Sequence, residues 1–580
     1  MAWYDDALFY HIYPLGLTGA PKQNSYTEPQ SRLRQLWDWL PHIRAIGCTA
    51  IYIGPLFESV GHGYETTDYK KLDSRLGTNE DLSAFVRQCH EMGLRVIFDG
   101  VFNHTGRDFF AFRDLKERRE LSPYRDWYCR VNFSGNNSFD DGFSYENWGG
   151  HDLLAKLNQK NPAVREYIAD VIRFWVSEFD VDGIRLDAAD VMDLDFLRFL
   201  RRQTENLKAD FWLMGEVIHG DYSRWVNHDT LHSVTNYMLH KALFSAHNDH
   251  NYFELAHTLN YVGNQTGDLK KLYTFADNHD VERIYTRLRC KRHFVPVHIL
   301  LYTLPGIPSL YYGSEFGIEG KKERHSDDSL RPALRIENFT NATEHNSCTA
   351  LLAALGKIRS AVPALRRGEY RQLQLQTGCY AFSRTWENSC VIVTVNNTDG
   401  DITMTLPASD GEYTGALFGG KAQAQNGQLT VTVGAASGEI WLHASAANIV
   451  SAPLPPIETA PVPPTSVESA PAPSESTPTV AAPERPEGTS APLDLHKPFE
   501  EMSVAELQES ILQCMRKNGP VTDYMLGTVR ENTHHGSLLN WVRSFRSSYA
   551  ACCGALTPSS TGFTQNSQFH SETASFYCFS

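Results

Sequence analysis

Two stretches of the sequence, LRVIFDGVFNH at residues 94–104 and VDGIRLDAAD at residues 181–190, share one pattern: a short apolar run that ends in polar and charged side chains. Six further β-rich runs begin at Leu8, Cys48, Phe211, Ser233, Leu272 and Pro308. Longer segments with helical periodicity separate most of these runs, which is typical of β/α units around a parallel sheet. Eight strands of this kind predict a closed (β/α)8 barrel, the TIM-barrel fold of the α/β class.

The spacing of the runs predicts the domain organisation. The third and fourth runs are unusually far apart, so residues 104–158 are expected to form a small inserted domain. The barrel would then comprise residues 1–103 and 159–365. In residues 366–445 the period changes to alternating apolar and polar positions bounded by Gly, Asn and Asp, which predicts a β-sandwich.

The last part of the chain differs in composition. Residues 446–494 are rich in Pro, Ala, Ser and Thr, and we expect a disordered linker. Residues 495–547 are predicted to be a helical accessory region, because Ser503 and Glu506 have the spacing of a capping box. Residues 548–580 have no period, and we expect an unstructured tail. An accessory, oligomerising, partner-binding or purely stabilising role for the helices stays open.

Composition and charge exclude several classes of partner. The net charge of −15 leaves no basic surface for nucleic acid or an anionic membrane. Asp5 and Asp6 stand where an export signal would be positively charged, and prolines interrupt the most apolar window, residues 294–312. The eleven cysteines show no CxxC pair. We therefore expect a cytoplasmic protein without a membrane span.

Polar residues at the ends of the predicted strands carry the chemistry, because ligands of such barrels bind at that edge. Arg185 and Asp187 lie two apart in a strand and share a face, so the guanidinium is expected to keep the carboxylate charged, as a nucleophile requires. Glu216 follows an apolar run, where partial desolvation favours the protonated form of a general acid. Asp187 and Glu216 are the two carboxyl groups that cleavage of an acetal through a covalent intermediate requires. Asp280 adds a negative charge that would face the cationic transition state.

Each residue also has a purely structural interpretation when taken singly. Arg185 and Asp187 could be a structural ion pair, Glu216 a helix cap, and Tyr64 a packing residue. His104 and His279 could be core histidines that pair with the backbone. The order of these residues at the ends of the third, fourth, fifth and seventh runs favours the functional interpretation.

The segments DGVFNH, GIRLDAAD, GEV and FADNHD resemble the four motif regions of the α-amylase family of glycoside hydrolases. The resemblance implies that Asp187 is the nucleophile, Glu216 the acid/base and Asp280 the transition-state stabiliser. It also implies a set of substrate-binding residues: Tyr64, Asp99, His104, Arg185, His279, Asp327 and Arg331. Tyr64 matches the aromatic residue that stacks on the sugar at the cleavage point, and Asp327 with Arg331 resembles a pair that holds the next ring.

The segment LLAKLN at residues 153–158 resembles a motif of the neopullulanase, cyclomaltodextrinase and oligoglucosidase branch. Typical endo-acting α-amylases have Lys-His where this chain has Asp190 and Val191, so we do not expect an endo-amylase.

Relatives of this branch build a dimer with an amino-terminal β-domain. The first predicted strand of this chain begins near residue 8, so the resemblance does not predict the same dimer, and the oligomeric state stays open. No cofactor is expected to be required; calcium near Asn103, a ligand in many family members, is an unsupported alternative.

The sequence thus predicts a retaining hydrolase that cleaves α-glucosidic bonds in maltodextrins, cyclodextrins or related α-glucans. An α-glucan glucosyltransferase or isomerase would use the same residues and is the first alternative. A noncatalytic barrel that binds a partner is the second.

Overall fold

The computed structural model describes residues 2–324, 326–444, 454, 503–505, 507 and 508. The predicted tail and most of the predicted linker and helical region lie outside these residues. In the described part of the helical region, the Leu507 amide donates to the Ser503 carbonyl over 3.0 Å. The Leu454 amide, within the predicted linker, donates to the carbonyl of Leu417 in the β-rich domain over 2.8 Å.

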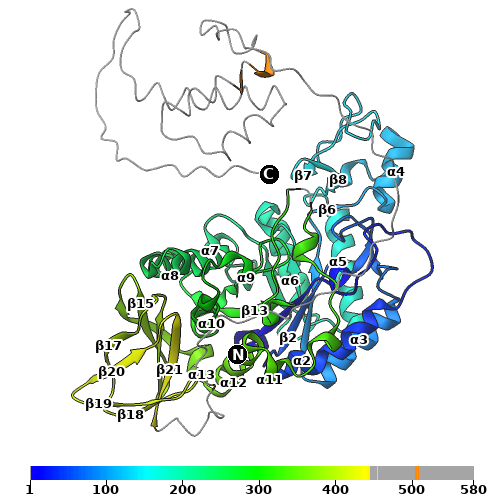
Figure 1. Ribbon diagram of the computed structural model, residues 1–580. Coiled ribbons are helices and arrows are strands. Elements are labelled where there is room, and N and C mark those ends of the chain that lie inside the picture. The colour runs from blue at the N-terminus through cyan, green and yellow to red at the C-terminus, as the bar shows by residue number, and fades with distance from the viewer. Residues whose placement is uncertain (1, 325, 445–453, 455–502, 506, 509–580) are drawn as a thin grey trace, which may run out of the picture. The chain divides into compact units, whose positions relative to one another are not determined.

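Eight parallel strands form the barrel in the centre of Figure 1. They are β1 (Phe9–Ile12), β2 (Ala50–Ile53), β5 (Arg95–Gly100), β9 (Gly183–Leu186), β10 (Trp212–Gly215), β11 (Ser233–Val234), β12 (Tyr273–Phe275) and β13 (Ile307–Tyr311). Their order is β11-β10-β9-β5-β2-β1-β13-β12, and a parallel bridge between Thr235 and Tyr273 joins the two ends. Each strand overlaps one of the eight predicted runs, so the predicted barrel is confirmed.

The strands are apolar on both faces because the barrel has a core inside and another outside. Phe9 and Trp212 stack at 5.1 Å between ring centroids in a cluster drawn mainly from the strands. The adjacent Tyr10 faces the helices instead. The main helices are α2 (Leu40–Ala45), α3 (Asn79–Glu91), α5 (Pro162–Phe179), α6 (Leu194–Thr204), α7 (Tyr237–Asn248), α8 (Tyr252–Thr266), α10 (Phe294–Thr303) and α12 (Ser347–Ala361).

The segment after β5 forms its own small sheet, with strands β6 (His104–Thr105), β7 (Asn147–Trp148) and β8 (His151–Lys156), beside α4 (Phe110–Arg118). Helix α5 then begins at Pro162, and the side chain of the preceding Asn161 accepts the Ala163 amide over 2.8 Å. The short remaining elements are α1 (Pro14–Leu17), β3 (Phe57–Ser59), β4 (Thr66–Leu72), α9 (Ile284–Arg287), α11 (Ala342–His345) and α13 (Pro363–Arg367).

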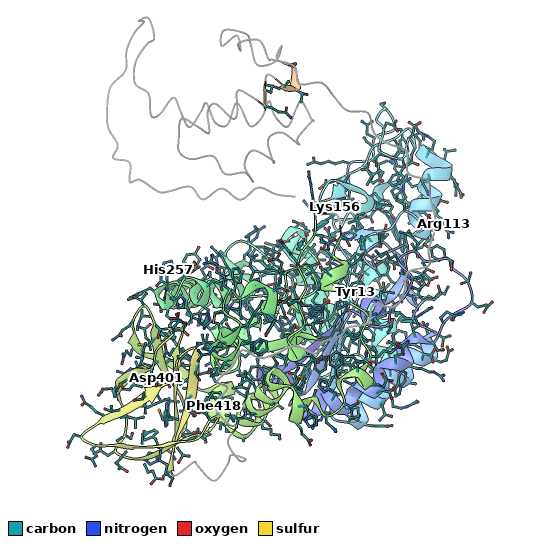
Figure 2. The ribbon with its side chains drawn as sticks, viewed as in Figure 1. Tyr13, Arg113, Lys156, His257, Asp401 and Phe418 are labelled. Atoms are coloured by element: carbon teal, nitrogen blue, oxygen red, sulfur yellow. The ribbon has the colours of Figure 1, made fainter. Side chains whose placement is uncertain are left out.

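The carboxy-terminal β-domain has two layers. Its larger sheet contains β14 (Glu369–Leu375), β15 (Cys379–Trp386), β16 (Ser389–Asn396), β18 (Gly411–Gly415), β19 (Lys421–Ala424) and β21 (Ser437–His443). The second layer is the pair β17 (Ile402–Pro407) and β20 (Gln428–Val433). Side chains of both layers, such as Ile392 and Met404, share one buried cluster, which confirms the predicted sandwich. Figure 2 labels Asp401 and Phe418 in this domain and Lys156 in the inserted one.

Within the described residues, no helix combines the length and apolarity needed to cross a membrane. The seven cysteines described are free thiols, and Cys48, Cys89, Cys348 and Cys379 are buried.

Buried histidines should make the fold sensitive to acid. Burial lowers the pKa of His247 to about 3 and that of His240 and His298 to about 4. Below their ordinary pKa of 6.5, the unfolded chain binds protons that the folded chain does not. We therefore expect the free energy of unfolding to fall as the pH is lowered from 6.5 to 5. Each of these histidines should contribute up to about 1.4 kcal/mol for each pH unit.

Urea unfolding at several pH values measures this effect. His228, whose side chain is 90% exposed, is the control, and His228→Gln should leave the pH dependence unchanged. A free energy of unfolding that stays constant between pH 6.5 and 5 would contradict the prediction.

Candidate active site

The backbone places the candidate carboxylates at one edge of the barrel. Asp187 follows β9 directly, and its amide donates to the carbonyl of Gly100 at the end of β5 over 3.1 Å. Glu216 follows β10, and its amide donates to the carbonyl of Leu186 over 2.9 Å. The ladder of hydrogen bonds thus continues one residue past each strand and fixes both side chains at the carboxyl end.

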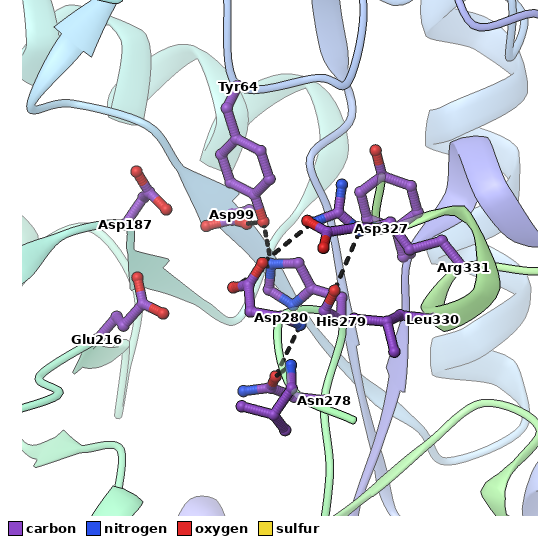
Figure 3. Close-up of polar contacts among 12 residues, drawn as sticks. Tyr64, Asp99, Asp187, Glu216, Asn278, His279, Asp280, Asp327, Leu330 and Arg331 are labelled. Atoms are coloured by element: carbon purple, nitrogen blue, oxygen red, sulfur yellow. Dashed lines mark hydrogen bonds and ion pairs between the residues drawn. The ribbon is translucent and has the colours of Figure 1, made fainter. Parts of the chain in front are cut away.

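Arg185 joins three carboxylates from three adjacent strands. Its Nη1 lies 2.7 Å from Asp99 Oδ1 and 2.8 Å from Asp187 Oδ1. Its Nη2 lies 2.7 Å from Glu216 Oε2. All four side chains are buried. In Figure 3 the carboxyl groups of Asp187 and Glu216 point toward the same side, where Asp280 lies.

Asp280 follows β12 and has two basic side chains as partners. His279 Nε2 lies 3.0 Å from Oδ2, and Arg331 Nη2 lies 3.0 Å from Oδ1. The same guanidinium nitrogen contacts Asp327 Oδ2 at 3.1 Å. Burial raises the pKa of Asp280, but His279 and Arg331 outweigh burial and hold this pKa below its ordinary value. Asp280 is therefore charged throughout the neutral range.

Tyr64 connects the two groups of residues. Its hydroxyl lies 3.2 Å from Asp99 Oδ2 and within hydrogen-bonding distance of His279 Nε2. The rings of Tyr64 and His279 are nearly parallel, 14° apart, with centroids at 5.8 Å. Nine of the ten predicted site residues consequently form one connected network of hydrogen bonds and ion pairs.

Among the described residues, His104 shares no side-chain hydrogen bond or ion pair with the other nine predicted residues, although its ring interacts with the backbone of Tyr64. It lies in β6 and is buried; its Nδ1 is 3.2 Å from Asn103 Nδ2, and its Nε2 has no partner among the described residues. Burial lowers the pKa of His104 to about 3, so the ring is neutral at ordinary pH. A neutral ring with an unused nitrogen is suited to a hydrogen bond with a sugar hydroxyl.

The charge state of Asp187 differs from the sequence-based expectation. Burial raises its pKa above the ordinary value, Arg185 acts in the opposite direction, and Glu216 and Asp99 add to the increase. Arg185 alone therefore does not keep Asp187 charged, because that guanidinium is shared among three carboxylates. The structure therefore favours the protonated form of Asp187 more than the sequence alone predicts.

Several residues of the site lie outside the predicted set. Tyr237, at the start of α7, donates from its hydroxyl to Glu216 Oε1 over 3.1 Å. Asn278 Nδ2 donates to the Tyr237 hydroxyl over 3.1 Å. Tyr13 packs under the Arg331 guanidinium, 4.7 Å from ring centroid to Cζ. Tyr237 ends the run SVTNY, so it could have been predicted by selecting the polar residues at the end of each β-rich run.

The surroundings of Asn103 offer one candidate oxygen ligand for calcium. The Asn103 side-chain oxygen is buried without a hydrogen-bond partner among the described residues, which fits one oxygen ligand. No group of three or more His, Cys, Asp or Glu side chains suited to a metal occurs in the described part of the chain. These residues do not fit a carboxylate-rich calcium site, so no step of the reaction below involves a metal.

Comparison with known proteins finds relatives for both the barrel and the carboxy-terminal domain. Residues 23–357 match the family model described as the alpha amylase catalytic domain, and residues 368–441 match the alpha-amylase C-terminal domain. Neopullulanase 2 of Thermoactinomyces vulgaris is 30% identical over 460 residues, covering 74% of this chain and 76% of that protein. A cyclomaltodextrinase of a Bacillus species is 28% identical over 444 residues, covering 72% and 77%.

A solved cyclomaltodextrinase structure superposes with a TM-score of 0.67 and 26% identity, covering 76% of this chain and 78% of that one. The catalytic-domain match alone extends over more than half of the 580 residues. The chain therefore belongs to the alpha-amylase family of glycoside hydrolases.

Proposed function

We propose that the protein is a retaining hydrolase that cleaves α-glucosidic bonds in maltodextrins, cyclodextrins or related α-glucans. One observation carries the proposal: Asp187 and Glu216, which follow neighbouring strands, contact two nitrogens of the buried Arg185 guanidinium. Their carboxyl groups point toward the side of the site where Asp280 lies (Figure 3). Glycoside hydrolysis by double displacement requires a carboxylate nucleophile and a carboxylic acid next to each other. The names of the relatives, neopullulanase and cyclomaltodextrinase, support this substrate class.

In the proposed reaction, Asp187 attacks the anomeric carbon while Glu216 gives its proton to the glycosidic oxygen. The bond between these two substrate atoms breaks, the leaving sugar departs, and a glycosyl ester forms on Asp187. Water then attacks the anomeric carbon, Glu216 takes the water proton, and the bond to Asp187 breaks. The charge of Asp280 stabilises the cationic transition states of both steps.

The proposed substrate contacts are divided between two sugar rings. The ring at the cleavage point would be held by the first set of residues: Tyr64, Asp99, His104, Arg185 and His279. Asp327 and Arg331 would hold the next ring. The catalytic carboxylates all lie within the proposed limits of the barrel, residues 1–103 and 159–365.

The anomeric form of the first product tests the mechanism. With maltotriose, a cyclodextrin and pullulan as substrates, proton NMR should show that the α-configuration is retained. The proposal also requires the carboxyl groups of Asp187 and Glu216 to lie about 5 to 5.5 Å apart in a substrate complex. Initial release of the β-anomer would contradict a covalent intermediate.

A glucosyltransferase is the second candidate, and two exposed apolar side chains favour it. Val191 is 48% and Ile218 39% exposed. Both are close in sequence to the catalytic carboxylates, and the amide of Asp190, the residue before Val191, donates to the Glu216 carbonyl over 3.2 Å. An apolar surface beside the acid/base would favour a sugar ring over water as acceptor. Products longer than maltotriose, detected early in its conversion, would establish transfer.

We also propose a cytoplasmic location, with the α-glucan as the substrate partner. The buried free thiols of Cys48, Cys89, Cys348 and Cys379 support a reducing compartment. Fractionation of cells that express the protein tests this: activity in the periplasmic or secreted fraction would contradict it.

A further inference from the structure

We infer that Tyr237 is a positioning residue for the acid/base, whose hydroxyl fixes Glu216 and stabilises its charged form after the proton has been given up. The inference rests on the proposed role of Glu216. Tyr237 is the first residue of α7 and follows β11 closely, so the barrel brings it to the edge where Glu216 ends β10. Its hydroxyl lies 3.1 Å from Glu216 Oε1.

The hydrogen bonds of Asn278 fix the direction of this contact. Its side-chain oxygen accepts the amides of Asp280 over 2.9 Å and Val281 over 3.2 Å. The amide nitrogen therefore faces the Tyr237 hydroxyl, at 3.1 Å, and donates to it. A tyrosine hydroxyl has a single hydrogen, and with Asn278 as donor that hydrogen is directed to Glu216.

The two oxygens of Glu216 have different surroundings. Oε2 accepts a hydrogen bond from the Ala188 amide over 3.2 Å and contacts Arg185 Nη2 at 2.7 Å. Oε1 has Tyr237 as its only hydrogen-bond donor among the described residues. Since a guanidinium and an amide occupy Oε2, the proton that Glu216 transfers resides on Oε1. The Tyr237 hydroxyl therefore contacts the very oxygen that changes its protonation state.

Neighbouring structure holds Tyr237 in this place. The preceding residue, Asn236, donates from its amide to the carbonyl of Tyr273 in β12 over 2.8 Å and caps α7 through the Leu239 amide over 3.0 Å. The Tyr237 ring packs edge-on against Phe275 at 5.0 Å. Through Asn278, the hydroxyl also links the acid/base to the turn that carries Asp280, so the two catalytic groups are held relative to one another.

The test is the pH dependence of kcat/KM for maltotriose in Tyr237→Phe, which keeps the ring and removes the hydroxyl. A donor to a carboxylate favours its charged form, so its loss should move the basic limb of the profile about one unit higher. Tyr222→Phe is the matched control, because the Tyr222 hydroxyl accepts the Met238 amide in the same first turn of α7 over 3.4 Å. The control should leave the basic limb in place.

The inference would be overturned if Tyr237→Phe folds and its basic limb lies at the same pH as in the unaltered enzyme. It would also be overturned if Tyr222→Phe shifts the basic limb as much as Tyr237→Phe does. If Tyr237→Phe does not fold, 3-fluorotyrosine at position 237 keeps the hydroxyl and makes it a stronger donor. The basic limb should then move to lower pH, and an unmoved limb would refute the inference. Glu216→Gln distinguishes failure of the proposed function from failure of this inference. If Glu216→Gln stays active, the proposed function is wrong. If Glu216→Gln is inactive but the variants at position 237 leave the basic limb in place, only the role of Tyr237 is refuted.

Discussion

Replacement of Asp187 by Asn or of Glu216 by Gln is expected to lower kcat on maltotriose at least about a thousandfold, because each residue makes or breaks a bond in the same transition state. Both substitutions keep the shape of the side chain, so circular dichroism should be unchanged. Asp195→Asn is a matched control on the exposed surface of α6, where Asp195 pairs only with Arg198 among the described residues. This control should retain full turnover.

The two substitutions should differ with an activated substrate. An α-glucosyl fluoride has a leaving group that departs without a proton, so Glu216→Gln should recover much of its first-step rate. Asp187→Asn should not recover, because it lacks the nucleophile. Asp280→Asn should be as slow as Asp187→Asn on maltotriose. A variant at position 187 or 216 that keeps most of its activity on a natural glucan would overturn the assignment.

Replacement of Arg185 by Met is expected to lower the free energy of unfolding by about 3 to 5 kcal/mol and to abolish activity. Arg185 is the shared cation of Asp99, Asp187 and Glu216, and its loss leaves three buried carboxylates without it. Acid should partly relieve the defect, since protonation removes the repulsion among these groups.

Urea unfolding at pH 7 and pH 5 measures the Arg185→Met effect. Arg198→Met is the control: its side chain is 42% exposed, and loss of such a surface pair should cost less than about 1 kcal/mol. An Arg185→Met protein as stable as the unaltered one would show that the buried cluster does not depend on its central cation.

The barrel and several site residues could be predicted because their signals are local. A strand buried on both faces appears as an apolar run, and a parallel barrel places the end of each run at the same edge. Asp99, Asp187 and Glu216 each end such a run, and Arg185 shares a face with Asp187 because strand side chains alternate. Tyr237 fits the same rule, but it follows a strand of only two residues, β11, where the apolar signal is weak.

The balance of charge within the site could not be predicted in this way. Asp280 and Arg331 are 51 residues apart, and only the folded loops place the guanidinium 3.0 Å from the carboxylate. Asp187 has Arg185 two residues away, but burial raises its pKa, and Glu216 and Asp99 on the same cation add to that increase. A pKa depends on all charges and on burial in three dimensions, so one neighbour in the sequence does not determine it.

The amino-acid sequence by itself thus determined the eight strands, the inserted and carboxy-terminal domains, and which polar residues stand at the active edge, because periodicity and strand ends are encoded residue by residue. The tertiary structure decided which of these residues touch. It joined nine of them around Arg185, Tyr64 and Arg331, left His104 Nε2 without a hydrogen-bond partner among the described residues, and placed the Tyr237 hydroxyl against Glu216. These contacts join separate strands and loops, and distances between such segments are set by packing of the whole barrel rather than by any local pattern.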